Sequence, residues 1–185
     1  MSTEEKILSA AAELLESGGT NALTSRAVCN AAGITAPTLY HHFGDMTGLV
    51  HALVTKGIAE FMTGKRAVRQ SLDPATGLRK GWDTWIDFAL RRPALFKLMV
   101  DRAAREPELG REVHMIMRGN LERMSEQGDL LVDVDVAARA MQAASNGVLS
   151  LLTQGATPVE VKETGALLFE SVLNRLRKTS ADAAT

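Results

Sequence analysis

The sequence predicts an all-α protein of about nine helices, with a compact N-terminal head and a larger helical body. Apolar side chains recur at three- and four-residue intervals along almost the whole chain of 185 residues, which is the spacing of amphipathic helices. Glycine and proline interrupt this spacing often enough to separate one helix from the next. No run alternates between apolar and polar residues as a strand does, and no internal repeat is evident.

The composition is ordinary for a globular protein, with 45% hydrophobic and 23% charged residues. Cys29, the single cysteine, excludes an intramolecular disulfide and favours a reducing cytoplasm. The acidic N-terminus lacks the features of a signal peptide. Residues 140–159 carry no charge, but their polar side chains favour a buried or interfacial helix over a membrane span. We expect a cytoplasmic protein.

Residues 23–43 are the most informative segment, because they read as a complete helix-turn-helix. Thr24 or Ser25 can cap a helix of residues 26–32 with its hydroxyl group. Gly33 can adopt the positive φ that ends a helix at little steric cost.

A short second helix follows, and its placement predicts a function. Thr35 can cap this helix, and Pro37 in its first turn sacrifices no hydrogen bond. Two helices joined by a tight turn leave the second one projecting, which suits the DNA major groove. An amphipathic helix with apolar positions from 7 to 15 precedes this motif and ends at Gly18 and Gly19. DNA binding is therefore the predicted function.

The rest of the chain reads as helices separated by proline or glycine. Gly44 and Asp45 should turn the chain into a long helix, which ends before Asp73 and Pro74. The predicted helices lie at about residues 46–70, 75–91, 93–99, 107–127, 134–154 and 159–177.

Charge is the main observation against DNA binding. The net charge is −1, and acidic residues outnumber lysine and arginine in the first 60 residues. Such a head attracts phosphate weakly, so shape and local chemistry must carry the contact. The cations there are Lys6, Arg26 and Lys56, and the acidic residues are Glu4, Glu5, Glu13, Glu16, Asp45 and Glu60.

Residues 35–43, TAPTLYHHF, complete a pattern that resembles the DNA-binding domain of the tetracycline-repressor (TetR) family. That pattern has a hydroxyl residue at the head of the recognition helix, an aromatic residue near Tyr40 and a phenylalanine at Phe43. The resemblance covers roughly residues 4–53. It rests on the first helix, the turn and LYHHF occurring in this order, because a bare helix-turn-helix is weak evidence.

The resemblance implies a DNA-binding head of residues 1–47 and an effector-binding and dimerisation body of residues 48–185. Residues 82–100, WDTWIDFALRRPALFKLMV, are also similar to the effector domains of one subgroup of the family. The implied protein is a ligand-responsive transcriptional regulator. Repression is the commoner behaviour in the family, and a small apolar or amphipathic effector would release the DNA.

The same resemblance assigns roles to residues of the head. The first turn of the recognition helix would face the groove floor, and other polar side chains would contact phosphates or bases. Leu39 and Phe43 should point inward, whereas exposed and packed positions are equally open for His42. The implied DNA-binding residues are Thr24, Ser25, Arg26, Thr35, Ala36, Pro37, Thr38, Tyr40, His41, His42 and Thr47.

One position departs from the family pattern. In the family, a lysine that binds a phosphate usually follows the phenylalanine that corresponds to Phe43. Here Met46 occupies that position, directly after Asp45. Thr47 and the first amides of that helix can still reach the DNA backbone. Protonated His41 and His42 would substitute in part, which predicts tighter binding as the pH falls from about 8 to about 6. Neutral histidines that bond to phosphate are the alternative.

Five of the eight aromatic residues fall between positions 61 and 96. With nearby methionines and polar side chains they can line an apolar pocket, or they can simply fill the core. The two tryptophans favour a pocket, because a buried indole N–H needs a partner. The candidate ligand-binding residues are Phe61, Trp82, Trp85, Phe88, Phe96, Met99, His114, Met117 and Asn120.

The last two helices combine small and apolar residues on uncharged faces that are too wide to be left in water. The family resemblance implies that they form a four-helix bundle with a twofold mate, and an intrachain core is the alternative. A twofold dimer would require a palindromic operator with half-sites about 34–36 Å apart or a multiple of that distance.

Two other functions compete with this one. A small helical enzyme could use the same pocket, but the chain has no phosphate-binding glycine loop and no nucleophile elbow. A protein-interaction module could use the apolar terminal helices to bind a different chain. His41 and His42 diverge on a helix and have no further ligands at metal spacing. We expect no enzymatic activity, no cofactor and no metal.

Overall fold

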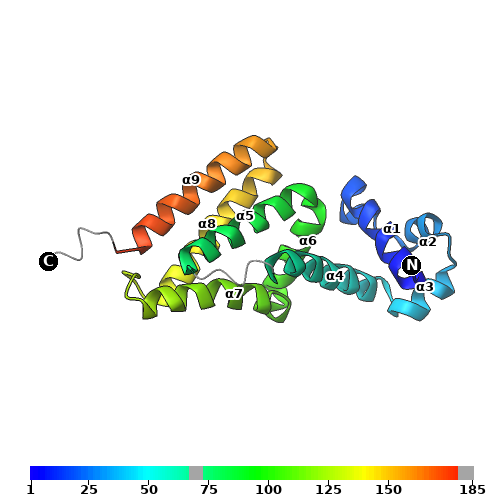
Figure 1. Cartoon of the computed structure of the whole chain (residues 1–185). Helices are drawn as coiled ribbons and strands as arrows, with labels where there is room; N and C mark the ends of the chain where they lie inside the picture. Colours follow the sequence, from blue (N-terminus) through cyan, green and yellow to red (C-terminus); the bar gives the residue numbers. More distant parts are fainter. Residues whose placement is uncertain (67–72, 179–185) are drawn as a thin grey trace. The chain divides into compact units, whose positions relative to one another are not determined.

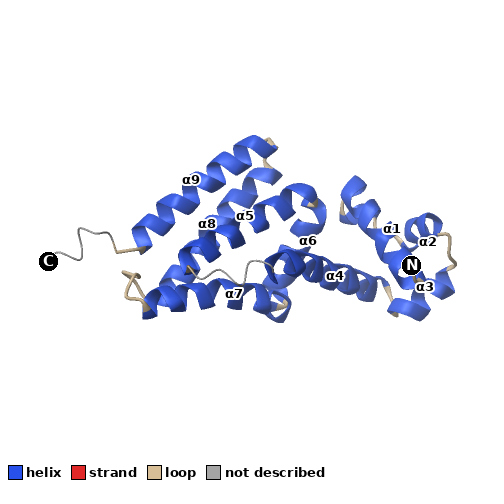
Figure 2. Cartoon of the chain, in the orientation of Figure 1, coloured by secondary structure: helices blue, strands red, loops and turns tan. Residues whose placement is uncertain are grey.

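The computed structural model describes residues 1–66 and 73–178, and it is helical almost throughout (Figures 1 and 2). Within these residues the assigned elements are helices, and one isolated antiparallel bridge joins Leu130 to Arg177. The all-α prediction is confirmed. The helices are α1 (Thr3–Gly18), a 3-10 turn (Thr20–Ala22), α2 (Ser25–Ala32), α3 (Ala36–Phe43), α4 (Met46–Arg66), α5 (Pro74–Arg91), α6 (Pro93–Arg105), α7 (Pro107–Glu126), α8 (Val134–Thr153) and α9 (Pro158–Leu176).

Local chemistry explains where these helices begin. Four of them, α5, α6, α7 and α9, start at a proline, whose missing N–H costs nothing in the first turn. Capping boxes start α1 at Ser2 and Glu5 and α9 at Thr157 and Glu160. The backbone hydrogen bond with Thr157 also holds the pKa of Glu160 below its ordinary value of 4.5.

Most predicted boundaries lie within one residue of the structure, but one is several residues short and another extends beyond the described residues. The helix that begins at Pro93 continues to Arg105 rather than Met99, because the apolar spacing marked only its buried part. The helix α4 is described as far as Arg66, and the predicted extension over residues 67–70 lies outside the described residues.

The chain divides into two units, which are described separately. The N-terminal unit contains residues 1–60 and 91–110, so α6 belongs with the first helices. Its buried side chains include Ile7 and Leu15 of α1 and Leu49 of α4. The predicted boundary at residue 47 separates two functions, whereas this division separates two compact units. The functional boundary stays a prediction.

The C-terminal unit contains residues 61–90 and 111–185. In its described part, α8 and α9 lie side by side, and their buried faces join α5 and α7 in one apolar core (Figure 1). Gly165 allows this packing, because an added Cβ would lie 2.5 Å from Ile86 Cδ1. In the described parts of the chain, no helix has the length and apolar character needed to cross a membrane.

Candidate nucleic-acid interface

The helix α2 starts and ends as a helix-turn-helix requires. The Thr24 hydroxyl accepts a hydrogen bond from the Ala27 amide at 3.2 Å, so Thr24 is the cap and Ser25 is the first helical residue. Gly33 ends the helix with φ 64°, and its amide donates to the Cys29 and Asn30 carbonyls. The left-handed turn at Gly33 sets the direction of α3.

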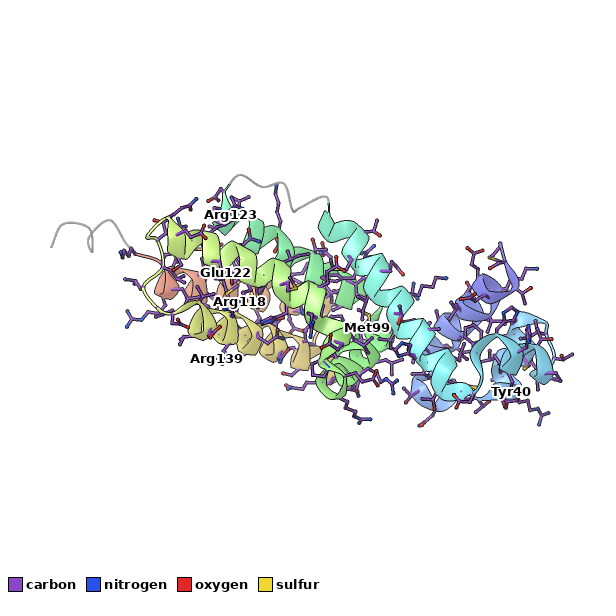
Figure 3. All side chains as sticks on the ribbon, turned by 90° about the horizontal axis from the view of Figure 1, so that it is seen from below. Tyr40, Met99, Arg118, Glu122, Arg123 and Arg139 are labelled. Carbon is purple, nitrogen blue, oxygen red and sulfur yellow. The ribbon has the colours of Figure 1, made fainter. Side chains whose placement is uncertain are left out.

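The helix α3 buries one face and exposes the other, which is the predicted reading face. Leu39 is fully buried and Phe43 is half-buried, so both anchor the helix as predicted. Ala36, Pro37 and the two histidines are exposed, and Tyr40, which is labelled in Figure 3, is 43% exposed. His42, for which the sequence left an exposed and a packed position equally open, is exposed.

The hydroxyls of α3 contact each other rather than the backbone. Thr35 occupies the N-cap position without making a side-chain cap, so the predicted capping hydrogen bond is wrong. Its hydroxyl oxygen instead lies 3.0 Å from that of Thr38. Thr35 is exposed and Thr38 is half-buried, which places two polar groups side by side at the start of the reading face.

The start of α4 holds two features that sequence reasoning missed. The Asp45 carboxylate accepts a hydrogen bond from the Gly48 amide at 2.7 Å, so this amide is already occupied. Gly48 also lies so close to the Phe43 carbonyl that a Cβ would be 1.9 Å from its oxygen. The pattern Asp-x-x-Gly before an apolar run was the available signal for the cap. Thr47 is exposed beside it.

A basic residue at the start of α6 offsets part of the acidic charge near the head. Arg92 lies 3.4 Å from Glu16 and 3.8 Å from Glu60, measured between nitrogen and carboxylate oxygen. Two of the acidic residues of the first 60 are therefore paired with Arg92. Arg26 remains exposed at the start of α2, where a guanidinium can reach phosphate.

The predicted ligand-binding residues fall into several groups. In the C-terminal unit the ring centroid of Phe61 lies 5.0 Å from Trp85 and 5.7 Å from Phe88. Trp82 packs separately against Phe169, with ring centroids 5.4 Å apart.

The remaining candidates differ in exposure. His114 is exposed, whereas Met117 and Asn120 are half-buried, and the Asn120 amide group donates to the Ile116 carbonyl. Phe96 and Met99 are buried in α6 of the N-terminal unit (Met99 is labelled in Figure 3). The effector site made by these residues stays a prediction.

Comparisons with known proteins agree with this geometry. Residues 7–53 match the family model described as "Bacterial regulatory proteins, tetR family". Residues 78–176, more than half of the chain, match the model described as "Tetracyclin repressor-like, C-terminal domain".

One curated relative and two solved structures are similar to this chain. The HTH-type transcriptional regulator UidR of Escherichia coli K12 is 29% identical over 76 residues, which cover 41% of this chain and 36% of that regulator. A Rhodococcus sp. RHA1 protein of unknown function has a TM-score of 0.81 at 20% identity, covering 96% of this chain and 97% of its own. The TetR family regulator PfmR of Thermus thermophilus has a TM-score of 0.75 at 21% identity, covering 97% and 100%.

The two family models leave little of the chain unmatched, and they fall on the helix-turn-helix and on the helical body in the expected order. Proteins of this family are transcriptional regulators rather than enzymes. The chain therefore belongs to the TetR family of bacterial transcriptional regulators.

Proposed function

We propose that this protein is a homodimeric repressor that binds a palindromic operator and releases it when a small apolar or amphipathic effector binds. The observation that carries the proposal is the reading face of α3, where Thr35, Ala36, Pro37 and Thr38 lead the helix while Leu39 is fully buried. A helix that is buried on one face and exposes small apolar and hydroxyl side chains on the other is suited to insertion into a major groove.

Exposed apolar side chains on the last two helices support the homodimer. Val159 and Leu167 of α9 are 62% and 68% exposed, and Val136 of α8 is 46% exposed. Exposed apolar residues on adjacent helices favour burial against a second copy. A twofold pairing of α8 and α9 would present two recognition helices to two half-sites.

A buried polar group supports the effector. Trp82 is 6% exposed, and its indole Nε1 has no hydrogen-bond acceptor among the described residues. A buried N–H without an acceptor is costly, and an effector with an acceptor group would remove that cost. The proposed coupling runs through α4, which links the recognition helix to the C-terminal unit and would move when the effector binds.

Fluorescence anisotropy tests DNA binding directly. The protein is titrated against a duplex from upstream of its own gene and against a scrambled duplex, at two salt concentrations. Tight binding to the upstream duplex alone supports the proposal. Equal weak binding to both, followed by failure of the protein to select any palindrome from a random pool, would contradict it.

Sedimentation equilibrium tests the dimer. Leu167→Glu should give a monomer with weakened palindrome binding, since a charge would be buried in the proposed interface. Met115→Glu is the matched control, because Met115 is 61% exposed on α7, outside the two interface helices. Dimers that persist in Leu167→Glu would contradict pairing through α9.

A further inference from the structure

A hollow of about 190 Å³ lies within the N-terminal unit, between α1, α4 and the start of α6. All of its lining residues belong to the segments 1–60 and 91–110, so its shape does not involve the other unit. Space left between packed helices forfeits the contacts that a filled core would make. A hollow of this size inside a packed unit is therefore a candidate binding site.

Small residues create the hollow. Ser9 and Ala12 lie one turn apart on α1, and Gly57 of α4 lines the same space. At Gly57 the helix α6 approaches α4 closely, because a Cβ there would lie 2.9 Å from Met99 Sδ (labelled in Figure 3) and 3.1 Å from Leu95 Cδ2. The two small side chains on α1 leave beside this approach a space that larger side chains would fill.

The floor of the hollow is apolar. Leu53 and Leu95 are each 1% exposed, and Leu8 is 6% exposed. These three leucines come from three different helices, so an apolar ligand group would contact α1, α4 and α6 at once. A cavity of about 150 Å³ is large enough for benzene. The hollow can thus take one aromatic ring or a short branched chain.

The rim carries a positive charge that has no partner. Lys56 lines the hollow and is exposed, and it forms no ion pair within residues 1–66 and 73–178. Its ammonium group is free to bind an anion that enters the hollow. A ligand with an apolar body and one carboxylate therefore complements both the floor and the rim.

The carboxylates nearby already have partners. Glu16 accepts hydrogen bonds from the amides of Ala94 and Leu95, each at 3.1 Å, and its Oε1 lies 3.4 Å from Arg92 Nε. Glu60, which is on the rim, lies 3.8 Å from Arg92 Nη1. Because Arg92 and the two amides offset these two negative charges, Lys56 is the charge left for a ligand to neutralise.

We propose that this hollow binds a small apolar carboxylate about the size of benzoate, with its apolar part against the three leucines and its carboxylate on Lys56. The site is separate from the effector site proposed in the C-terminal unit. It requires neither operator binding nor dimerisation. A ligand that joins three helices of one unit binds the folded state alone, so it should raise the unfolding temperature.

NMR titration of the full chain tests the site, with benzoate as the probe and benzyl alcohol and benzylamine as its neutral and cationic counterparts. Benzoate should bind with a Kd of about 1 mM, as expected for so small a ligand. Amide signals of residues 9–12 and 53–57 should shift, and the ring protons should show Overhauser effects to the methyl groups of Leu8, Leu53 and Leu95. Benzyl alcohol should bind about fivefold more weakly, since it lacks the exposed ion pair.

Three results of this titration would overturn the proposal. The first is the absence of saturable benzoate binding at about ten times the expected Kd. The second is a set of signal changes confined to the C-terminal unit, which would place benzoate in the other site. The third is tighter binding of benzylamine than of benzoate, which would show that Glu60 rather than Lys56 determines the ligand charge.

Lys56→Gln and Lys97→Gln are the variants that test the charge. Both remove one exposed lysine of the N-terminal unit, but Lys97 does not line the hollow. Lys56→Gln should bind benzoate and benzyl alcohol equally, whereas Lys97→Gln should keep the fivefold preference of the wild type. A preference that survives in Lys56→Gln would contradict the assigned role of Lys56.

Ser9→Leu and Ser17→Leu test the space itself. Both place leucine on α1, but Ser9 is half-buried in the hollow and Ser17 is exposed away from it. Ser9→Leu should unfold at a higher temperature than Ser17→Leu, because the leucine fills the hollow, and benzoate should no longer raise that temperature. Benzoate binding that persists in folded Ser9→Leu would contradict the site. If Ser9→Leu does not fold, the comparison of Lys56→Gln with Lys97→Gln decides the proposal.

Discussion

The hydroxyl oxygens of Thr35 and Thr38 lie 3.0 Å apart at the start of α3. One of the two hydroxyls must donate to the other, so each restricts the rotamers of its partner. The pair is thus ordered before any DNA arrives, which lowers the entropic cost of forming a base contact.

Thr38→Val tests whether this pair reads sequence. Valine keeps the shape of threonine and removes the hydroxyl, so the fold should be retained. We expect operator affinity to fall about five- to tenfold, because a base contact and the hydrogen bond that orders Thr35 are both lost. Affinity for unrelated DNA should change little, because no phosphate contact is removed. Anisotropy on the operator and on a scrambled duplex measures both. Equal weakening on the two duplexes would assign Thr38 to the phosphate backbone instead.

Asp45→Asn should strengthen DNA binding. Asparagine caps a helix as well as aspartate does, so the hydrogen bond with the Gly48 amide can persist while the negative charge is removed. Affinity should rise a few-fold for operator and unrelated DNA alike in the anisotropy titration, since the effect is electrostatic. An unchanged affinity on both duplexes would place Asp45 away from the phosphates.

Arg26→Gln provides the opposite change in charge. It should weaken binding to both duplexes and reduce the magnitude of the slope of log K against log salt concentration by about 1. An identical salt slope for wild type and Arg26→Gln would show that Arg26 does not contact the DNA phosphates. Thermal unfolding of both charge variants checks that the helices are intact.

Gly165→Ala should destabilise the protein by about 1–3 kcal/mol. The added Cβ would lie 2.5 Å from Cδ1 of Ile86, which is only 5% exposed and has little room to move. Gly119→Ala in α7 is the matched control, because among the described residues no atom beyond its chain neighbours and its own helix backbone lies within 4 Å of the added Cβ. That substitution should stabilise by up to about 1 kcal/mol through helix propensity. Urea unfolding compares the two, and a neutral Gly165→Ala would show that α9 can shift.

Arg118→Met should alter stability in a pH-dependent way. Arg118 of α7 pairs with Asp135 of α8 and with Glu122, which lies 2.9 Å away; Arg118, Glu122 and the neighbouring Arg139 are labelled in Figure 3. The hydrogen bond from Arg118 lowers the pKa of Asp135 below its ordinary value of 3.8. A carboxylate whose pKa is lower in the folded state stabilises the fold at pH values above its unfolded pKa. This stability is lost as the pH falls through the folded pKa.

Wild type should therefore unfold at a higher temperature than Arg118→Met at pH 7, and the difference should vanish well below pH 3.8. The residues are exposed, so high salt should shrink the difference at pH 7 as well. A difference that is constant across this pH range would indicate lost packing of the arginine stem rather than a lost ion pair.

Trp82→Phe tests the effector proposal. Phenylalanine keeps an aromatic ring against Phe169 and removes the buried Nε1–H. An effector identified by operator release should then bind about tenfold more weakly, because one hydrogen bond in a buried site is lost. Operator affinity without effector serves as the control and should not change. Calorimetry measures the effector, and undiminished binding would place it away from Trp82.

Local signals made most of the helices predictable. Proline marks the start of four helices, and Gly33 ends α2 with the expected left-handed turn. The buried Leu39 and the exposed Tyr40 also follow from helical spacing on a short amphipathic element.

Contacts between residues far apart in the chain could not be predicted from the sequence. By sequence, Glu16 is only an unfavourable charge in the head, because nothing near it in the chain reveals partners almost eighty residues away. The sequence likewise does not reveal that α6, which carries Phe96 and Met99, groups with the first helices in the N-terminal unit. The ligand-binding role of these two residues stays a prediction. The apolar character of a residue predicts that it is buried, but it does not predict which helices pack against it.

The N-terminal unit is discontinuous, since residues 61–90 separate its two segments. A hybrid regulator that exchanges DNA specificity with a relative could be joined at a single point after the helix-turn-helix. In this protein such a junction would leave a foreign α1 facing the native α6, and the free amides of Ala94 and Leu95 would meet whatever side chain replaced Glu16. A transferable reading cassette for this chain must include both segments, residues 1–60 and 91–110.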